Sequence, residues 1–98
     1  MNIIKLDTTK SIIKPPTSQR LKSGLVVLKK GEEIGPHSTD EKEEMIIILK
    51  GEAILEIEGD NKKIQPGHIV YIPKNTGHNV RNDSEVTLKY IYITALLD

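Results

Sequence analysis

The feature that most constrains the fold of this chain is the regular spacing of its turn signals. Turn signals such as Lys50-Gly51, Gly59-Asp60, Pro66-Gly67, Asn75-Thr76 and Asn82-Asp83 interrupt the sequence about once every 8–12 residues, the spacing expected of short antiparallel strands. The segments between these pairs are short and rich in β-branched residues, and they show no sustained helical periodicity. This pattern is typical of a small β-sandwich or barrel, so we expect an all-β fold.

The expected strands are the apolar runs between these turns. The clearest strands are expected at residues 25–29, 45–49, 53–58, 69–72 and 86–94. Shorter strands are expected near residues 12–14, 37–39 and 77–80, and Lys62-Lys63 is interpreted as a hairpin tip. Pro15-Pro16 cannot lie in a central strand. We therefore expect residues 1–24 to form an N-terminal arm or edge strands, and residues 25–98 to form the barrel domain.

Composition excludes several classes of protein. The 98 residues are enough for one domain. Fourteen Lys and Arg balance fourteen Asp and Glu, so no basic surface for nucleic acid is expected. No apolar run approaches the ~20 residues that span a bilayer, and the N-terminus is too polar for a signal peptide. These features predict a cytoplasmic protein without nucleic-acid or membrane partners.

Several of the apolar runs lack the alternation of a strand with one wet face. Residues 25–28, 45–49 and 90–93 read LVVL, MIIIL and YIYI, so side chains on both faces are apolar. One face is expected inside the barrel. The other face is expected against the arm or against a second subunit, which predicts a homodimer.

Two of the three histidines could converge with one carboxylate. His37 and Glu44 flank a charged turn, and a hairpin across residues 40–43 would place them close together. A later strand would then have to bring His78 to the same point. Since the chain has no cysteine, a metal site would need nitrogen and oxygen ligands, and two imidazoles with one carboxylate suit a divalent transition metal. The alternative is that both histidines line a pocket or the core without a metal.

The intervals around these residues form two motifs. They read G-x5-H-x-T-x4-E-x6-G from Gly31 to Gly51, and G-x5-P-x-N-x2-H-x3-N from Gly67 to Asn82. These motifs resemble those of the cupin superfamily, G-x5-H-x-H-x3-4-E-x6-G and G-x5-P-x-G-x2-H-x3-N. The resemblance extends over about residues 25–94 and implies a single-domain jelly-roll β-barrel with an internal pocket, commonly dimeric.

The resemblance also implies roles for individual residues. His37, Glu44 and His78 fall on metal-ligand positions, which implies a site for Mn, Fe, Ni or Zn. Thr39 stands where the family often has a second histidine, so water or substrate would occupy that ligand position.

Further side chains are assigned from the residues themselves. Tyr90 and Tyr92 lie on one face of their expected strand, and we expect this face to point inward, where a phenol could contact a ligand. The alternative is a tyrosine packed in the core. Thr39 and these two tyrosines are therefore the expected pocket residues. His68 follows Pro66-Gly67 and is expected at a turn outside the pocket.

Two classes of function fit this pattern. One is a small metal-dependent enzyme, such as an oxygenase, isomerase or lyase, in which the metal acts as a Lewis acid on a small molecule. The other is a non-catalytic module that holds a sugar or another metabolite without a metal. Both predict a small-molecule ligand inside the barrel.

Overall fold

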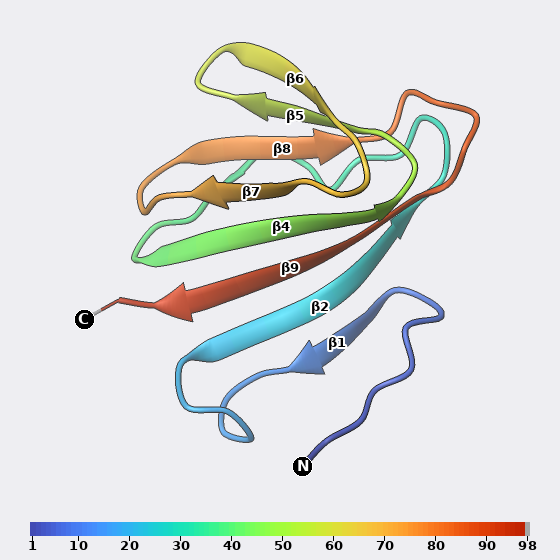
Figure 1. Ribbon diagram of the computed structural model, residues 1–98. Coiled ribbons are helices and arrows are strands. Elements are labelled where there is room, and N and C mark those ends of the chain that lie inside the picture. The colour runs from blue at the N-terminus through green and yellow to red at the C-terminus, as the bar shows by residue number, and fades with distance from the viewer. Residues whose placement is uncertain (98) are drawn as a thin grey trace.

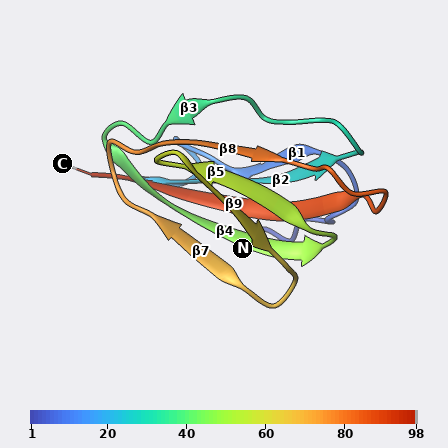
Figure 2. The same ribbon diagram turned by 90° about the horizontal axis from the view of Figure 1, so that it is seen from above.

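The computed structural model describes residues 1–97, which form two antiparallel sheets and no helix (Figure 1). The five-stranded sheet has the order β1 (Lys10–Ile13), β2 (Leu21–Leu28), β9 (Leu88–Leu96), β4 (Lys42–Lys50) and β7 (Ile69–Ile72). The four-stranded sheet has the order β3 (His37–Ser38), β8 (Gly77–Arg81), β5 (Ala53–Ile57) and β6 (Asp60–Ile64). Seen from above, β5 and β8 lie across β4 and β9 (Figure 2). No helix in residues 1–97 is long and apolar enough to cross a membrane.

The predicted all-β fold is confirmed, and one strand had not been predicted. The strand β6 forms a hairpin with β5, and the turn between them contains Glu58 and Gly59, both at positive φ. Lys62-Lys63 therefore lies within a strand, and its interpretation as a hairpin tip is wrong. Most of β6 is exposed and pairs only with β5, so it needs no apolar residues to form. At the N-terminal side, β2 begins at Leu21 and runs through the boundary expected after residue 24.

The core lies between the inner faces of the two sheets. Alternate residues of each strand point into it, because successive side chains of a strand lie on opposite faces. The buried apolar cluster consists of Val26, Leu28, Ile46, Ile48, Ala53, Leu55, Ile72, Val80, Leu88 and Tyr90.

The same inner face becomes polar toward one end of the barrel. In β4, Ile48 and Ile46 are followed, two residues at a time toward the N-terminus, by Glu44 and Lys42. In β8, His78 stands two residues before the core residue Val80. The packing of the apolar end therefore determines that the polar side chains also point inward.

The outer face of the five-stranded sheet is apolar and exposed along β4 and β7. Exposed fractions are 38% for Met45, 41% for Leu49, 58% for Ile69 and 57% for Tyr71. The strand β1 pairs edge to edge with β2 and is separated from β4 by β2 and β9, so it leaves this face open. The sequence analysis expected either the N-terminal arm or a second subunit to cover this face. The arm leaves these side chains exposed.

Two motif glycines differ in what surrounds them, which allows a matched test. Gly51 and Gly67 both have left-handed backbones, with φ of 81° and 88°. A Cβ at Gly51 would lie 2.7 Å from the carbonyl oxygen of Thr87, whereas a Cβ at Gly67 would meet nothing within 4 Å. Gly67→Ala should therefore cost only the backbone strain.

We predict that Gly67→Ala lowers the free energy of unfolding by about 1 kcal/mol, the usual cost of a left-handed alanine. Gly51→Ala should cost ~1–3 kcal/mol more, because the added methyl group presses on the backbone of the neighbouring segment. Urea unfolding of both variants measures the difference. Equal losses would contradict the close approach at Gly51.

Candidate functional site

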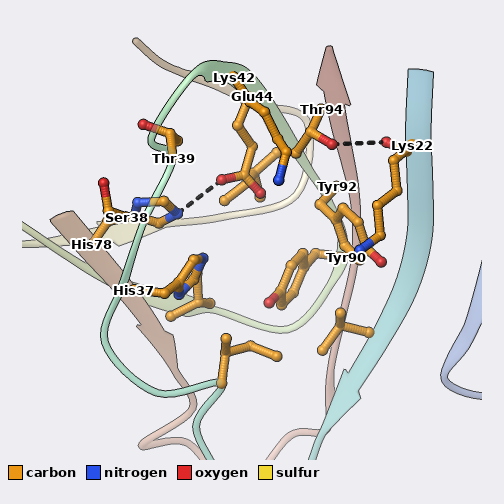
Figure 3. A pocket seen from close by; sticks show the side chains of 14 residues that line it. Lys22, His37, Ser38, Thr39, Lys42, Glu44, His78, Tyr90, Tyr92 and Thr94 are labelled. Atoms are coloured by element: carbon orange, nitrogen blue, oxygen red, sulfur yellow. Dashed lines mark hydrogen bonds and ion pairs between the residues drawn. The ribbon is translucent and has the colours of Figure 1, made fainter. Parts of the chain in front are cut away.

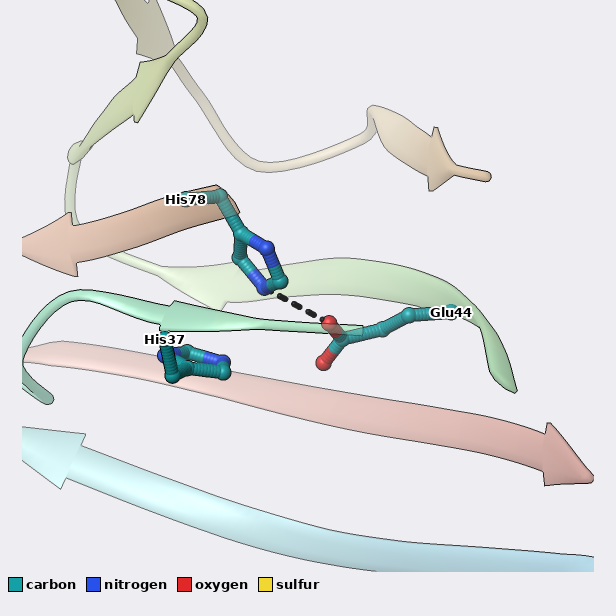
Figure 4. Close-up of side chains that lie close together, drawn as sticks. All are labelled: His37, Glu44 and His78. Atoms are coloured by element: carbon teal, nitrogen blue, oxygen red, sulfur yellow. Dashed lines mark ion pairs between the residues drawn. The ribbon is translucent and has the colours of Figure 1, made fainter. Parts of the chain in front are cut away.

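The candidate site joins the two sheets at the polar end of the barrel (Figure 4). His37 and His78 are direct cross-strand partners on β3 and β8, and their ring centroids are 4.2 Å apart. Glu44 approaches them from β4 of the other sheet. One ligand atom from each of the three residues lies within 4.8 Å of the other two. The structure thus brings together the three residues expected to converge.

The strand pairing that produces this convergence differs from the expected hairpin. The strand β3 pairs with β8 and belongs to a different sheet from β4. The chain passes between the sheets through a turn in which Asp40 has a left-handed φ of 52°. His37 and Glu44 therefore face each other across the space between the sheets rather than along one ladder.

Both histidines are held by their Nδ1 atoms. The Nδ1 atom of His37 lies 2.9 Å from the Gly35 carbonyl oxygen, and that of His78 lies 3.0 Å from the Thr76 carbonyl oxygen. A carbonyl oxygen only accepts hydrogen bonds, so each Nδ1 carries the hydrogen. In the neutral rings the Nε2 lone pairs are left free, as is usual for histidines that bind metals.

The closest contact of the site is between His78 and Glu44. Their Nε2 and Oε1 atoms are 2.8 Å apart, and the two residues are only 4% and 7% exposed. The contact lacks hydrogen-bond geometry, so within residues 1–97 the Nε2 atom of His78 is buried without a hydrogen-bond partner. Buried polar atoms of this kind are rare and need a partner. A divalent transition metal fits, since the donor set is two imidazole nitrogens and one carboxylate.

Opposing influences act on the protonation of His78. Burial is the largest and lowers its pKa, because it disfavours the charged ring. The close approach of Glu44 and the bond to the Thr76 carbonyl oxygen act in the other direction, as does the charge of Glu44. The net effect raises the pKa of His78 above its ordinary value of 6.5.

The hydroxyl group of Thr39 is used by the backbone. Its Oγ1 atom donates a hydrogen bond to the Pro73 carbonyl oxygen at 2.7 Å and accepts one from the Thr76 amide at 3.0 Å. These bonds fasten the turn between β7 and β8, which leads into His78. Thr39 lines the pocket, but its hydroxyl oxygen points away from Glu44 (Figure 3). Thr39 therefore acts on the site by supporting the strand that carries His78.

The three residues open onto a cavity of about 300 Å³ inside the barrel. Tyr90 and Tyr92 line it, so the face they share does point inward (Figure 3). Burial, followed by the nearby charge of Glu44, raises the pKa of both phenols. Both rings are therefore neutral at physiological pH and can donate hydrogen bonds to a ligand.

Other polar residues of interest lie outside this cavity. His68 is exposed in the turn before β7, where its Nδ1 atom is 3.1 Å from the Gln65 carbonyl oxygen. Glu43 points to the opposite face of β4 from Glu44 and accepts a hydrogen bond from the Tyr71 hydroxyl at 2.9 Å. Asn82 is fully buried and bonds the backbone of its own turn. These residues have structural environments that do not involve the site.

Sequence reasoning missed two lysines in the cavity wall. Lys22 and Lys42 line the same cavity as Glu44 and the tyrosines. The signal for Lys42 was strand parity, because it lies two residues from Glu44 and therefore on the same face. Lys22 carried no comparable signal, since the predicted strand began only at Leu25.

Comparison with known proteins identifies the family. The cupin domain family matches residues 24–94 of the chain. The chain belongs to the cupin family. The protein is 33% identical over 88 residues to an uncharacterized protein of Aquifex aeolicus (strain VF5), a match that covers 90% of this chain and 64% of the relative. This cupin thus spans less than two thirds of the relative's length.

Solved structures share the fold of this cupin. A cupin protein from Bacteroides fragilis superposes with a TM-score of 0.86 at 18% identity, over 98% of this chain and 82% of the other. An RmlC-like cupin family protein with a double-stranded β-helix fold, from Methanocaldococcus jannaschii, gives a TM-score of 0.80 at 23% identity, over 96% and 87%. The expected jelly-roll barrel is confirmed by these matches.

We predict that Glu44→Gln lowers the pKa of His78 in the metal-free cupin. The substitution removes the carboxylate charge that favours the imidazolium and leaves the effect of burial, which favours the neutral ring. Measured by NMR during a pH titration, the pKa of His78 should lie above 6.5 in the parent protein and fall below it in the variant. The ring signals of His68 serve as an internal reference. An unchanged His78 titration would contradict the contact with Glu44.

Proposed function

We propose that this cupin binds a divalent transition metal ion inside its barrel, through the Nε2 atoms of His37 and His78 and the carboxylate of Glu44. The observation that supports this most directly is the convergence of three ligand atoms, from three strands, within 4.8 Å of one another. Ligand atoms ~2.1 Å from one ion and at right angles to each other lie ~3 Å apart. Small side-chain rotations would therefore suffice to place all three around one ion.

The donor set indicates which metals and which chemistry to expect. Two imidazoles and one carboxylate, with no thiolate in the chain, suit Mn, Fe, Ni or Zn. Three protein ligands leave coordination positions open for water or for a small molecule in the adjacent cavity. A bound ion would supply Lewis-acid chemistry to that molecule. This arrangement would serve an oxygenase, an isomerase or a lyase.

A second candidate function is a non-catalytic module that binds a sugar or another metabolite without a metal. It is favoured by the 2.8 Å contact between His78 and Glu44. With His78 protonated, the two residues compensate each other's charge and the site is complete without an ion. Metal titration separates the two candidates.

We predict that the purified, metal-stripped protein binds one equivalent of Mn²⁺, Ni²⁺ or Zn²⁺ in isothermal titration calorimetry at pH 8. His78→Ala should weaken binding by more than about a hundredfold, since even residues that only orient a metal ligand typically contribute 10–100-fold. His68→Ala is the matched control and should bind like the parent, because His68 lies outside the cavity.

Two outcomes of this titration would contradict the metal site. An absence of stoichiometric binding by the parent protein would favour the metal-free module instead. Equal losses in the variants of His78 and His68 would mean that any bound metal is held elsewhere. Binding should also weaken as the pH falls through the raised pKa of His78, because the proton competes with the metal for Nε2.

The apolar outer face supports a further proposal, that this cupin is a homodimer. Met45, Leu49, Ile69 and Tyr71 together expose apolar side chains on β4 and β7.

We predict a dimer by multi-angle light scattering and a shift to monomer for Ile69→Lys, which would place a charge in the interface. Val86→Lys, at a residue that is 50% exposed in the turn before β9, is the control and should remain dimeric. A monomeric parent protein would contradict this proposal.

A further inference from the structure

Two lysines occupy inward positions beside the candidate metal site. Alternate residues of β2 face the interior, and this series ends at Lys22 after Leu28, Val26 and Gly24. Lys22 pairs with Thr94 of β9. In β4 the inward-facing residue next to Glu44 is Lys42. Both lysines line the cavity, and Figure 3 shows their side chains directed toward the tyrosines and Glu44.

The two ammonium groups have no carboxylate partner in the part of the chain that the structure describes. No Asp or Glu oxygen of residues 1–97 lies within 4 Å of either group, and Glu44 contacts His78 instead. Among residues 1–97, Glu44 is the only acidic residue that lines the cavity. The chain as a whole has zero net charge. The cavity therefore carries a local excess of positive charge that the composition does not reveal.

A glycine makes room for a tyrosine beside Lys22, and we call Lys22, Lys42 and this tyrosine the cationic wall of the cavity. Gly24 pairs with Tyr92, and a Cβ at residue 24 would lie 2.6 Å from the Tyr92 hydroxyl oxygen. Without that atom the ring can lie flat against β2. Figure 3 shows the Tyr92 hydroxyl and the Lys22 side chain at the same part of the cavity wall. The neutral phenol adds a hydrogen-bond donor next to the charge.

We propose that the ligand of this cavity is a small organic anion, whose carboxylate or phosphate group is bound by Lys22, Lys42 and the Tyr92 hydroxyl. All three line the cavity from the five-stranded sheet, on β2, β4 and β9, and their donors would form charge-assisted hydrogen bonds with such a group. His37 and His78 line the cavity from the four-stranded sheet, and Glu44 lies beside Lys42 on β4. This inference extends the proposed function by naming the ligand class, and the cationic wall is present whether or not a metal is bound.

The size of the cavity limits the ligand. A volume of about 300 Å³ corresponds to roughly ten water molecules at ~30 Å³ each. The ligand should therefore have about ten non-hydrogen atoms, with the anionic group at one end and an oxygen or nitrogen atom at the end that faces the histidines.

Paired probes of equal size test this proposal. Succinate and its neutral diamide, succinamide, test the carboxylate, and glycerol 3-phosphate and glycerol test the phosphate. Binding is followed by chemical shift changes in 15N-labelled protein, both metal-free and loaded with Zn²⁺. At least one anion should bind more than about tenfold tighter than its neutral partner, and added salt should weaken this binding. The better anion shows which of the two groups the cavity prefers.

Lysine variants locate the binding site. Lys42→Gln should weaken binding of the preferred anion about tenfold, the usual value of one hydrogen bond to a charged group. The more exposed Lys22→Gln should weaken it severalfold. Lys50→Gln, at the other end of β4 and outside the cavity, is the matched control and should leave binding unchanged.

The same measurements separate this proposal from the metal site. Lys22→Gln and Lys42→Gln should bind Zn²⁺ as the parent does, while His78→Ala should lose Zn²⁺ but retain anion binding in its metal-free form. Failure of Zn²⁺ to bind would therefore overturn only the metal site. Equal binding of anionic and neutral probes, no binding of either anion at millimolar concentration, or an equal loss in Lys50→Gln would overturn the anion site.

Discussion

The alternation of side chains across each strand is the constraint on which the rest of this structure depends. In β4, Ile48 and Ile46 pack in the core between the sheets, and the same alternation then directs Glu44 and Lys42 inward. A register slip of one residue would move all four side chains to the outer face. Burial of the two isoleucines is favourable and fixes the register of β4. The same register places the Glu44 carboxylate inside the barrel, although burying a charge is by itself unfavourable.

That carboxylate is tolerated because the opposite sheet supplies a partner for it. Glu44 is 7% exposed and lies 2.8 Å from His78, and the positive charge of the protonated ring reduces the cost of removing the carboxylate from water. His78 in turn is oriented by the Thr76 carbonyl oxygen, and the Thr76 amide is bound by the hydroxyl of Thr39. The side chains of the site are therefore carried by paired strands and by a turn that the Thr39 hydroxyl holds in place. Such a support positions them more precisely than a free loop would.

The interior of the barrel is divided into two chemical environments by the same strands. One end is sealed by apolar side chains, and the other is a cavity that combines a carboxylate, two imidazoles, two neutral phenols and two ammonium groups. Low exposure strengthens electrostatic interactions at the buried side of this cavity. A chain without net charge can therefore hold a strongly polar, locally cationic site.

Much of this protein was determined by local sequence. Turn spacing and β-branched runs predicted eight of the strands approximately, and motif spacing predicted that His37, Glu44 and His78 converge. Asn75 stands where the second family motif has glycine, and its φ of 55° is a left-handed conformation that asparagine tolerates better than most residues. Such features can be read from the sequence because side-chain alternation and backbone sterics act over a few neighbouring residues.

Only the tertiary structure decided which segments meet. The pairing of β3 with β8 and the two bonds of the Thr39 hydroxyl depend on segments more than thirty residues apart. The strand β6 escaped prediction because an exposed edge strand carries no apolar pattern. Lys22 is an exposed residue that lines the cavity only because β2 pairs with β9 in the five-stranded sheet. Contacts of this kind arise from packing between distant strands, which no local pattern of residues encodes.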